Sequence, residues 1–481
     1  MVSKQSAKPL SAKLDTSPDQ PLNGAVWTQR VQQYEALKRD LVDFVLDAEG
    51  ELATALEAFS AEQIGRWGKP SLSGLDRGEL AIDMFATEGQ VAGQSVIDLW
   101  IKSEASLSAE VQTWLGQWQT SFNGLFVVQD VRSDSYVLMN WLTEKRYSVR
   151  AGRSQPTEIL SRMKVGEIVL ARLLPLTSTE WTFSGPLTLL GKLGEPKLAV
   201  AIGNFKKWFP QHLYGDAPEM KEVAWESVQQ QHEDFVEFFG AEQVTLSGYE
   251  LNKKLQAYQD HSTEKQLSKA GIDSSKSLQE IAKDAGISEE DVSEAMDALG
   301  EESTVAQKLL ESKQSLRMVM PKVNLPDELR RAEAVTAFVH PRWGQIFLKD
   351  YAHLEELLTQ SSSPEAEAET LAKLDRLTLK YLAEDRVNAY VWRRLAEAYK
   401  NPIEGSLRRV LDDPKFDAEQ DLEKTLIRYG KALIPELPDS ASVPIHLHEL
   451  FQSALKAVGK ETGKKDDPVK KKAKKKSGFG S

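Results

Sequence analysis

The chain has 481 residues, of which 41% are hydrophobic and 27% are charged, and its formal net charge is -12. These values are ordinary for folded proteins of two or three domains, and they exclude a wholly disordered chain. The chain contains no cysteine, which excludes disulfide frameworks, thiolate zinc sites, iron–sulfur clusters and cysteine nucleophiles.

Residues 1–24 are rich in Ser, Pro, Lys and Gln, so we expect a disordered leader there, and whether it is a targeting peptide stays open. The N-terminus lacks the apolar core of a secretory signal. No apolar run approaches the roughly 18 residues that a membrane helix needs, so we expect no membrane span. The expected location is the cytoplasm, with the plastid stroma as the alternative.

The first predicted domain, residues 25–120, is helical. Apolar residues recur there at steps of three and four, which is the stripe of an amphipathic helix. The residues of this stripe are Trp27, Val31, Tyr34, Leu37, Leu41 and Phe44. Further helical patterns run to Phe59, from 82 to 100 and from 110 to 118.

The residue pattern changes over residues 121–205, where runs rich in β-branched and aromatic residues are separated by turn residues. Such runs are typical of short antiparallel strands. We predict five strands, at 125–131, 136–142, 145–149, 167–174 and 180–190, that form a small β-barrel. Gly166 precedes the fourth strand, and the segment 164–172 resembles the strand entry of SH3-like and OB-like barrels, where glycine permits a tight turn.

The remaining predicted domains are helical, at 206–360 and 370–458, with a linker between them. The predicted fold class is therefore α+β, mainly α, with helical domains flanking a small antiparallel β-barrel of SH3-like or OB-like type. From Lys460 onward nine lysines stand against three acidic residues, and we predict a disordered, lysine-rich tail over residues 459–481.

A helix-turn-helix-like pair is predicted at 277–299. Ser277 with Glu280 and Ser288 with Asp291 form two capping boxes, and Gly286 lies where the turn is needed. The second helix has no lysine or arginine up to residue 302, which disfavours sequence-specific DNA binding. We expect it to dock a protein partner through four acidic residues, namely Glu289, Glu290, Asp291 and Glu294.

The predicted barrel contains a basic stretch, with seven lysines and arginines against three glutamates between residues 141 and 172. Cationic grooves with interleaved aromatic residues bind single-stranded nucleic acids. The candidate polyanion-binding residues are Lys145, Arg146, Arg150, Arg153, Arg162, Lys164, Arg172, Trp141 and Tyr147. The alternative is a solvated sheet whose aromatic residues pack inside.

Four short sequence segments between residues 114 and 185 resemble a known family. They are Gly124 to Val128, Trp141 to Val149, Ala171 to Leu176 and Trp181 to Gly185. This segment resembles uncharacterised bacterial proteins that often end in a SEC-C zinc motif, which is similar to the motif at the C-terminus of the secretion motor. That motif needs cysteines, so it is absent from this chain, and the resemblance assigns no functional residue here.

No catalytic signature is recognisable, whether phosphate-binding glycine loop, nucleophile elbow or paired-histidine zinc helix. His446 and His448 are two residues apart but lack a second group of ligands, so we expect no metal and no cofactor. The first hypothesis is a non-enzymatic interaction or adaptor protein with a protein partner. The alternatives are an RNA-associated factor that uses the basic barrel face and the lysine tail, and an enzyme of unrecognised type.

Overall fold

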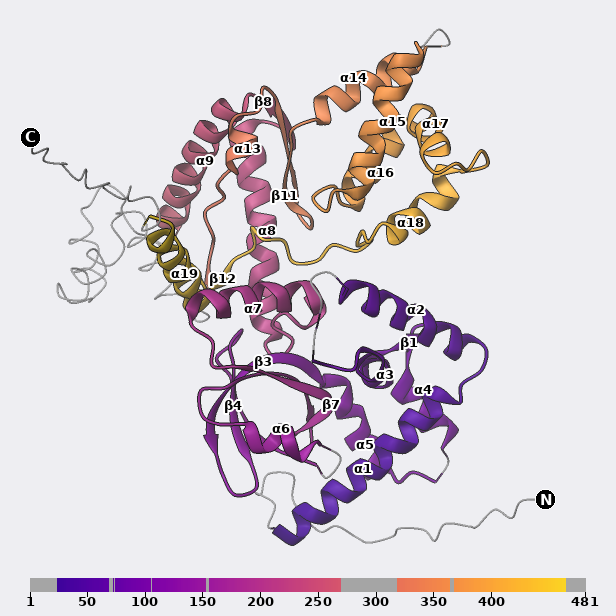
Figure 1. Ribbon diagram of the computed structural model, residues 1–481, viewed down its shortest axis with the longest axis vertical. Coiled ribbons are helices and arrows are strands. Elements are labelled where there is room, and N and C mark those ends of the chain that lie inside the picture. Colours follow the sequence, from indigo (N-terminus) through magenta and orange to yellow (C-terminus); the bar gives the residue numbers. More distant parts are fainter. Residues whose placement is uncertain are drawn as a thin grey trace, which may run out of the picture. The chain divides into compact units, whose positions relative to one another are not determined.

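The computed structural model describes residues 24–68, 72, 74–104, 106–152, 155–269, 318–363 and 367–463 (Figure 1). The chain forms two compact units, Met1–Leu193 and Gly194–Ser481. Helices dominate both units and several small sheets accompany them, which confirms a mainly helical α+β fold. Among the described residues, no helix combines the length and the apolar character that a membrane crossing requires.

The first unit begins with a helical layer. Its elements are α1 (Gly24–Leu46), α2 (Glu51–Arg66), α3 (Arg77–Glu88), β1 (Gln90–Val91), β2 (Gln94–Ser95), α4 (Val96–Ser103), α5 (Ala109–Gln117) and the 3-10 helix η1 (Trp118–Thr120). Side chains of Asp76, Ser95 and Ser108 accept hydrogen bonds from backbone N–H groups at the starts of α3, α4 and α5, as N-caps do. The predicted stripe of α1 is confirmed where it is described, because Val31, Tyr34 and Leu41 are buried in one core.

The five predicted strands are present, each within three residues of its predicted start. They are β3 (Phe122–Val131), β4 (Tyr136–Asn140), β5 (Arg146–Arg150), β6 (Ile168–Pro175) and β7 (Glu180–Gly191), with α6 (Thr157–Arg162) between β5 and β6. They pair as a closed barrel in the order β3-β4-β5-β7-β6. All pairs are antiparallel except β5 with β7, which is parallel. The predicted antiparallel pairing is therefore correct for four of the five pairs and wrong for β5 with β7, because an odd number of strands cannot close a ring through antiparallel pairs alone.

The barrel interior is filled by aromatic rings. The ring of Tyr147 lies 5.5 Å from that of Phe122, 6.0 Å from that of Phe126 and 5.2 Å from that of Trp181. Gly124 permits this packing, since a Cβ atom there would lie 2.4 Å from the Phe126 ring. The side chains that point inward along each strand thus form one continuous apolar core.

The second unit places a three-stranded sheet between helices. Its elements up to that sheet are α7 (Glu195–Trp208), the 3-10 helix η2 (Pro210–His212), α8 (Pro218–Phe239), β8 (Gln243–Leu246), α9 (Gly248–Lys269), β9 (Met318–Val319), α13 (Asp327–Arg330), β10 (Val335–His340) and β11 (Gly344–Leu348). The elements after it are α14 (Tyr351–Ser361), α15 (Ala368–Ala383), α16 (Ala389–Ala398), α17 (Lys400–Val410), α18 (Ala418–Arg428), β12 (Val443–Pro444) and α19 (Ile445–Gly463).

Strand β10 is central in the order β11-β10-β8, and it separates two cores. Val335, Ala337 and Val339 pack with α8, α9 and α13, whereas Phe338 packs with the core of α14 to α18. This alternation follows from the two-residue period of a strand.

The structure differs from the predictions in three places. The domains predicted to be helical, 206–360 and 370–458, contain the strands β8 to β12. Helix α7 begins at Glu195, inside the predicted barrel region 121–205, and α19 ends at Gly463, inside the tail predicted to be disordered from residue 459. The run Val335–His340 is rich in β-branched and aromatic residues and thus carried a strand signal. The strand signal of this short run was missed because the sequence on both sides of it has a helical pattern.

Candidate nucleic-acid interface

The outer surface of β4 and β5 carries one part of the predicted basic site. Along β5, Tyr147 and Val149 point into the core, so Arg146, Ser148 and Arg150 lie on the opposite face of the strand. Met139 pairs with Arg146 in the ladder. Directly paired residues share a face, so Met139 of β4 lies beside Arg146 on the outer surface.

Arg150 is held by two carboxylates. Its Nη1 lies 2.5 Å from Asp134 Oδ2, and its Nη2 lies 3.0 Å from Glu180 Oε1. The Arg150 side chain is 13% exposed, whereas that of Asp134, in the turn between β3 and β4, is 55% exposed. Arg150 is thus at the surface with its charge largely neutralised.

The other predicted cations lie at different places. Lys145 is half-buried in the turn before β5, and Arg146 is exposed. Arg162 at the end of α6 and Lys164 just after it are also exposed. Arg153 lies outside the described residues. The structure therefore brings Lys145, Arg146 and Arg150 together on one strand and its turn.

The aromatic part of the prediction is wrong for Tyr147. Its side chain is 8% exposed and packs inside the barrel, so it cannot offer a ring to a nucleotide base. Trp141 is half-buried directly after β4, and its backbone N–H donates to Leu125 O at 2.9 Å. The alternative interpretation of the sequence, with the ring inside, describes Tyr147 correctly.

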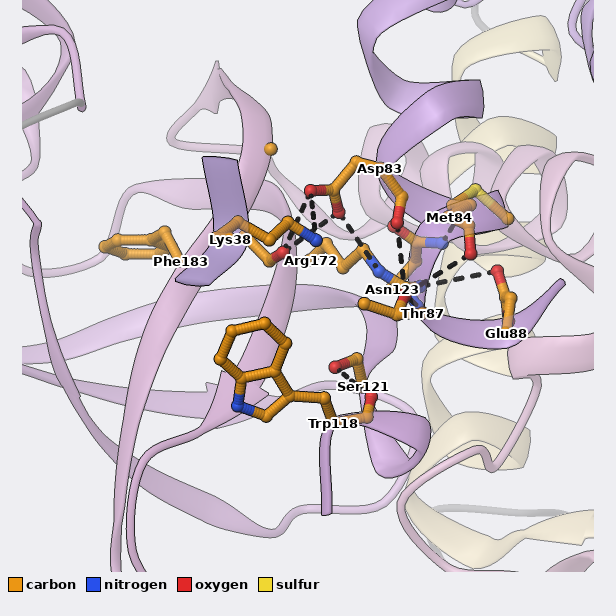
Figure 2. Close-up of polar contacts among 12 residues, drawn as sticks. Lys38, Asp83, Met84, Thr87, Glu88, Trp118, Ser121, Asn123, Arg172 and Phe183 are labelled. Atoms are coloured by element: carbon orange, nitrogen blue, oxygen red, sulfur yellow. Dashed lines mark hydrogen bonds and ion pairs between the residues drawn. The ribbon is translucent and has the colours of Figure 1, made fainter. Parts of the chain in front are cut away.

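Arg172 is a second correction, because its side chain is 0% exposed. It lies between β6 and α3 in a cluster of charged and polar groups (Figure 2). Its Nη2 donates to Thr87 Oγ1 at 2.7 Å, and its Nε and Nη1 lie 3.4 Å from Asp83 Oδ2 and 3.6 Å from Glu88 Oε1. Arg172 therefore binds groups of α3 and is not available to a polyanion.

Asp83 is the centre of this cluster. Its carboxylate accepts hydrogen bonds from Ser184 Oγ at 2.9 and 3.0 Å, and its Oδ1 lies 2.9 Å from Lys38 Nζ. Two cations, Lys38 and Arg172, thus face two carboxylates, Asp83 and Glu88, which satisfies the rule that buried charges are paired.

Burial dominates the electrostatics of the cluster. It lowers the pKa of the Lys38 ammonium, an effect that the charge of Asp83 opposes. Burial also raises the pKa of the Tyr34 hydroxyl, which lies 3.5 Å from Phe183 O. Both directions follow from the cost of a charge in an apolar environment.

The cluster connects the helical layer to the barrel. Lys38 belongs to α1 and Asp83 to α3, whereas Arg172 and Ser184 belong to β6 and β7. Asn123 of β3 adds a contact with Met84 of α3. Figure 1 shows β4 on the side of the barrel away from α3 and α4, so the helices are anchored on one side of the barrel and the basic strand face lies elsewhere.

The sequence carried a signal for this role of Arg172 that we missed. Every other residue of β6 is apolar, and the whole strand is buried. A charged residue in a continuous apolar strand must find a partner inside the fold. Its partner Asp83 lies 89 positions earlier in the sequence, which no local pattern reveals.

Other predicted sites lie outside the described residues. These are the helix pair 277–299 with Glu289, Glu290, Asp291 and Glu294, and residues 464–481 of the lysine-rich tail. Within the described ranges, no group of three or more His, Cys, Asp or Glu side chains is arranged to hold a metal ion.

No family model matches this chain, and neither a curated protein nor a solved structure is similar enough to count as a match.

Proposed function

We propose that the barrel is of the OB type. Its strand order, the parallel pair of β5 with β7 and the position of α6 between the third and fourth strands support this assignment. An OB-fold is a five-stranded Greek-key barrel that binds oligonucleotides and oligosaccharides on the face of its second and third strands. These strands correspond here to β4 and β5.

We propose that the chain is a non-enzymatic, RNA-associated factor that binds a single strand on this face. The observation that carries the proposal is the position of Arg146, which is exposed on the outer face of the third strand of the barrel with Lys145 in the adjoining turn. Arg150 lies on the same face beside Asp134 and Glu180. Charge supports it too. Apart from the buried Arg172, residues 122–193 carry eight lysines and arginines against six acidic residues, whereas residues 24–121 carry seven against fifteen.

The expected mode of RNA binding follows from the aromatic rings that pack inside the barrel and are not on the face of β4 and β5. The rings of Phe122, Tyr147 and Trp181 pack with one another in the barrel core, so they do not contribute the base stacking that strengthens many single-strand sites. Phosphate contacts then supply most of the affinity. Such binding tolerates different sequences and weakens steeply with salt.

The test is fluorescence anisotropy of a labelled oligouridine of about 12 nucleotides, titrated with the full chain between about 50 and 200 mM salt. We expect Arg146→Gln to weaken binding and to reduce the slope of log K against log salt by about 0.7, the value of one phosphate contact on a single strand. The matched control is Lys102→Gln, because Lys102 is an exposed cation of α4 in the same unit.

A second variant tests the role of Arg150. Asp134→Asn removes the exposed carboxylate beside Arg150 and leaves the buried contact with Glu180 in place. We expect tighter binding, because one negative charge leaves the face. The RNA proposal fails if the natural chain does not bind at low salt, or if Arg146→Gln and Lys102→Gln behave alike.

The adaptor hypothesis stays a prediction, since its docking residues lie outside the described residues. Protein capture from lysate before and after nuclease treatment separates the two functions. Partners that resist nuclease would favour the adaptor.

A further inference from the structure

A turn at the start of β6 brings another cationic segment to the edge of the proposed face. Gly166 has a φ of +85° and its N–H donates to Val128 O at 2.9 Å, whereas Val128 N–H donates to Glu167 O at 3.0 Å. These two bonds fix the turn 164–167 against β3. Lys164 is exposed in this turn.

Lys192, which directly follows β7, folds over the same turn. A Cβ atom at Gly166 would lie 3.5 Å from Cε and 3.6 Å from Nζ of Lys192. Lys192 is exposed. Two cations from separate segments, Lys164 and Lys192, are therefore gathered at one turn, although 28 positions separate them in the sequence.

The barrel surface connects this turn to Arg146. Arg146 of β5 pairs with Met139 of β4, and Met139 pairs with Val127 of β3. Val127 directly precedes Val128, whose backbone forms the two hydrogen bonds with the turn. Gln129, on the same face of β3, donates from Nε2 to Met139 Sδ at 3.3 Å. A strip of half-buried apolar and amide side chains thus runs from β5 across β4 to β3.

The charge along this strip favours an anion. Lys145, Arg146, Lys164 and Lys192 stand along it, and their nearest acidic neighbours in the sequence are Glu144, Glu167 and Glu195. Asp130 of β3 is paired with Arg132 at 3.1 Å.

We propose that Lys164 and Lys192 each contact a phosphate at this turn, so that a single strand of RNA crosses the barrel from Arg146 over Met139 and Gln129 to the turn. The path covers three interstrand spacings of about 4.8 Å, or about 14 Å in all. Met139 and Gln129 lie between the two cationic ends and contact the bases. This inference rests on the proposed function and defines the extent of its site.

The experiment measures the same anisotropy with Lys164→Gln, Lys192→Gln and the double variant. Each single change is expected to reduce the salt slope by about 0.7, and the double change by about 1.4. The change in slope should be larger for an oligouridine of about 12 nucleotides than for a dinucleotide, which is too short to span the path of about 14 Å and can bind at the Arg146 end alone. Thermal unfolding confirms the fold of each variant.

The outcomes separate the two proposals. If the natural chain does not bind the oligonucleotide, both proposals fall. If Arg146→Gln weakens binding but Lys164→Gln and Lys192→Gln match the Lys102→Gln control, RNA binding stands and the phosphate contacts at the turn are overturned.

Discussion

At the scale of single residues, Arg172 shows how position decides what a charge does. The same guanidinium that could contact phosphate on the surface here contacts Thr87, Asp83 and Glu88 inside the first unit. Burying a charge is costly unless it is paired and hydrogen-bonded. The cluster therefore contributes little net stability as a whole, yet each of its members depends on the others.

Removing Asp83 tests this dependence. Asp83→Asn leaves Lys38 and Arg172 with one carboxylate, Glu88, so we expect the free energy of unfolding to fall by about 3–5 kcal/mol, as for other broken buried pairs. Denaturant titration followed by tryptophan fluorescence measures it. Asp98→Asn in the first turn of α4 is the control and should cost about 1 kcal/mol or less.

The double variant Asp83→Asn with Lys38→Met sharpens this test. It removes one charge of each sign, so we expect it to recover part of the loss. Strict additivity of the two single effects would contradict a coupled cluster.

His340 makes the second unit sensitive to pH. Its Nδ1 accepts hydrogen bonds from the backbone N–H groups of Arg342 at 3.0 Å and Trp343 at 3.2 Å. Burial lowers its pKa below 6.5, and the nearby His232 adds to this effect while Glu242 opposes it. The ring of Tyr390 also packs against it.

The direction of the pH effect follows from linkage. Below about pH 6.5 the unfolded chain binds a proton at His340 that the folded chain does not, so stability falls as the pH falls. We expect this loss of stability below about pH 6.5 to diminish in His340→Asn, whose side-chain oxygen can accept the same bonds without titrating. An unchanged dependence in that variant would assign the effect to other groups.

At the scale of elements, β3 depends on one glycine. The Phe126 ring occupies the place of a side chain at Gly124, and Gly124 pairs with Ala171 of β6. Small residues at both positions leave room for the aromatic core of the barrel.

Gly124→Ala should therefore overpack the barrel. A Cβ atom would lie 2.4 Å from Phe126 Cζ, and shifting this fully buried ring should cost about 1–3 kcal/mol in the free energy of unfolding. Gly116→Ala in α5 is a matched control, because nothing lies within 4 Å of its added Cβ and alanine favours helix. Equal stabilities of the two variants would refute the close packing at Gly124.

The sequence predicts most elements but not their partners. The strands β3 to β7 and the stripe of α1 were predictable because their apolar residues recur with the period of each element. The contact between Arg172 and Asp83 was not, since it joins a strand to a helix far away in the sequence. Counting cations in a stretch likewise cannot show that Arg150 is neutralised by Asp134 and Glu180.

At the scale of the whole molecule, each of the two units has its own apolar cores. The barrel and the α1–α5 layer fill the first unit, and the sheet of β8, β10 and β11 divides the cores of the second. The basic barrel face belongs to the first unit alone. We therefore propose that nucleic acid binds to residues 122–193.

The most direct measurement of this central claim is photo-crosslinking of the full chain to an oligouridine that carries a reactive base, followed by mass spectrometry of the attached peptides. We predict crosslinks in the peptides that contain Met139 and Lys145, and in those that contain Lys164 and Lys192. Crosslinks confined to the second unit or to the helices α1–α5 would contradict this claim.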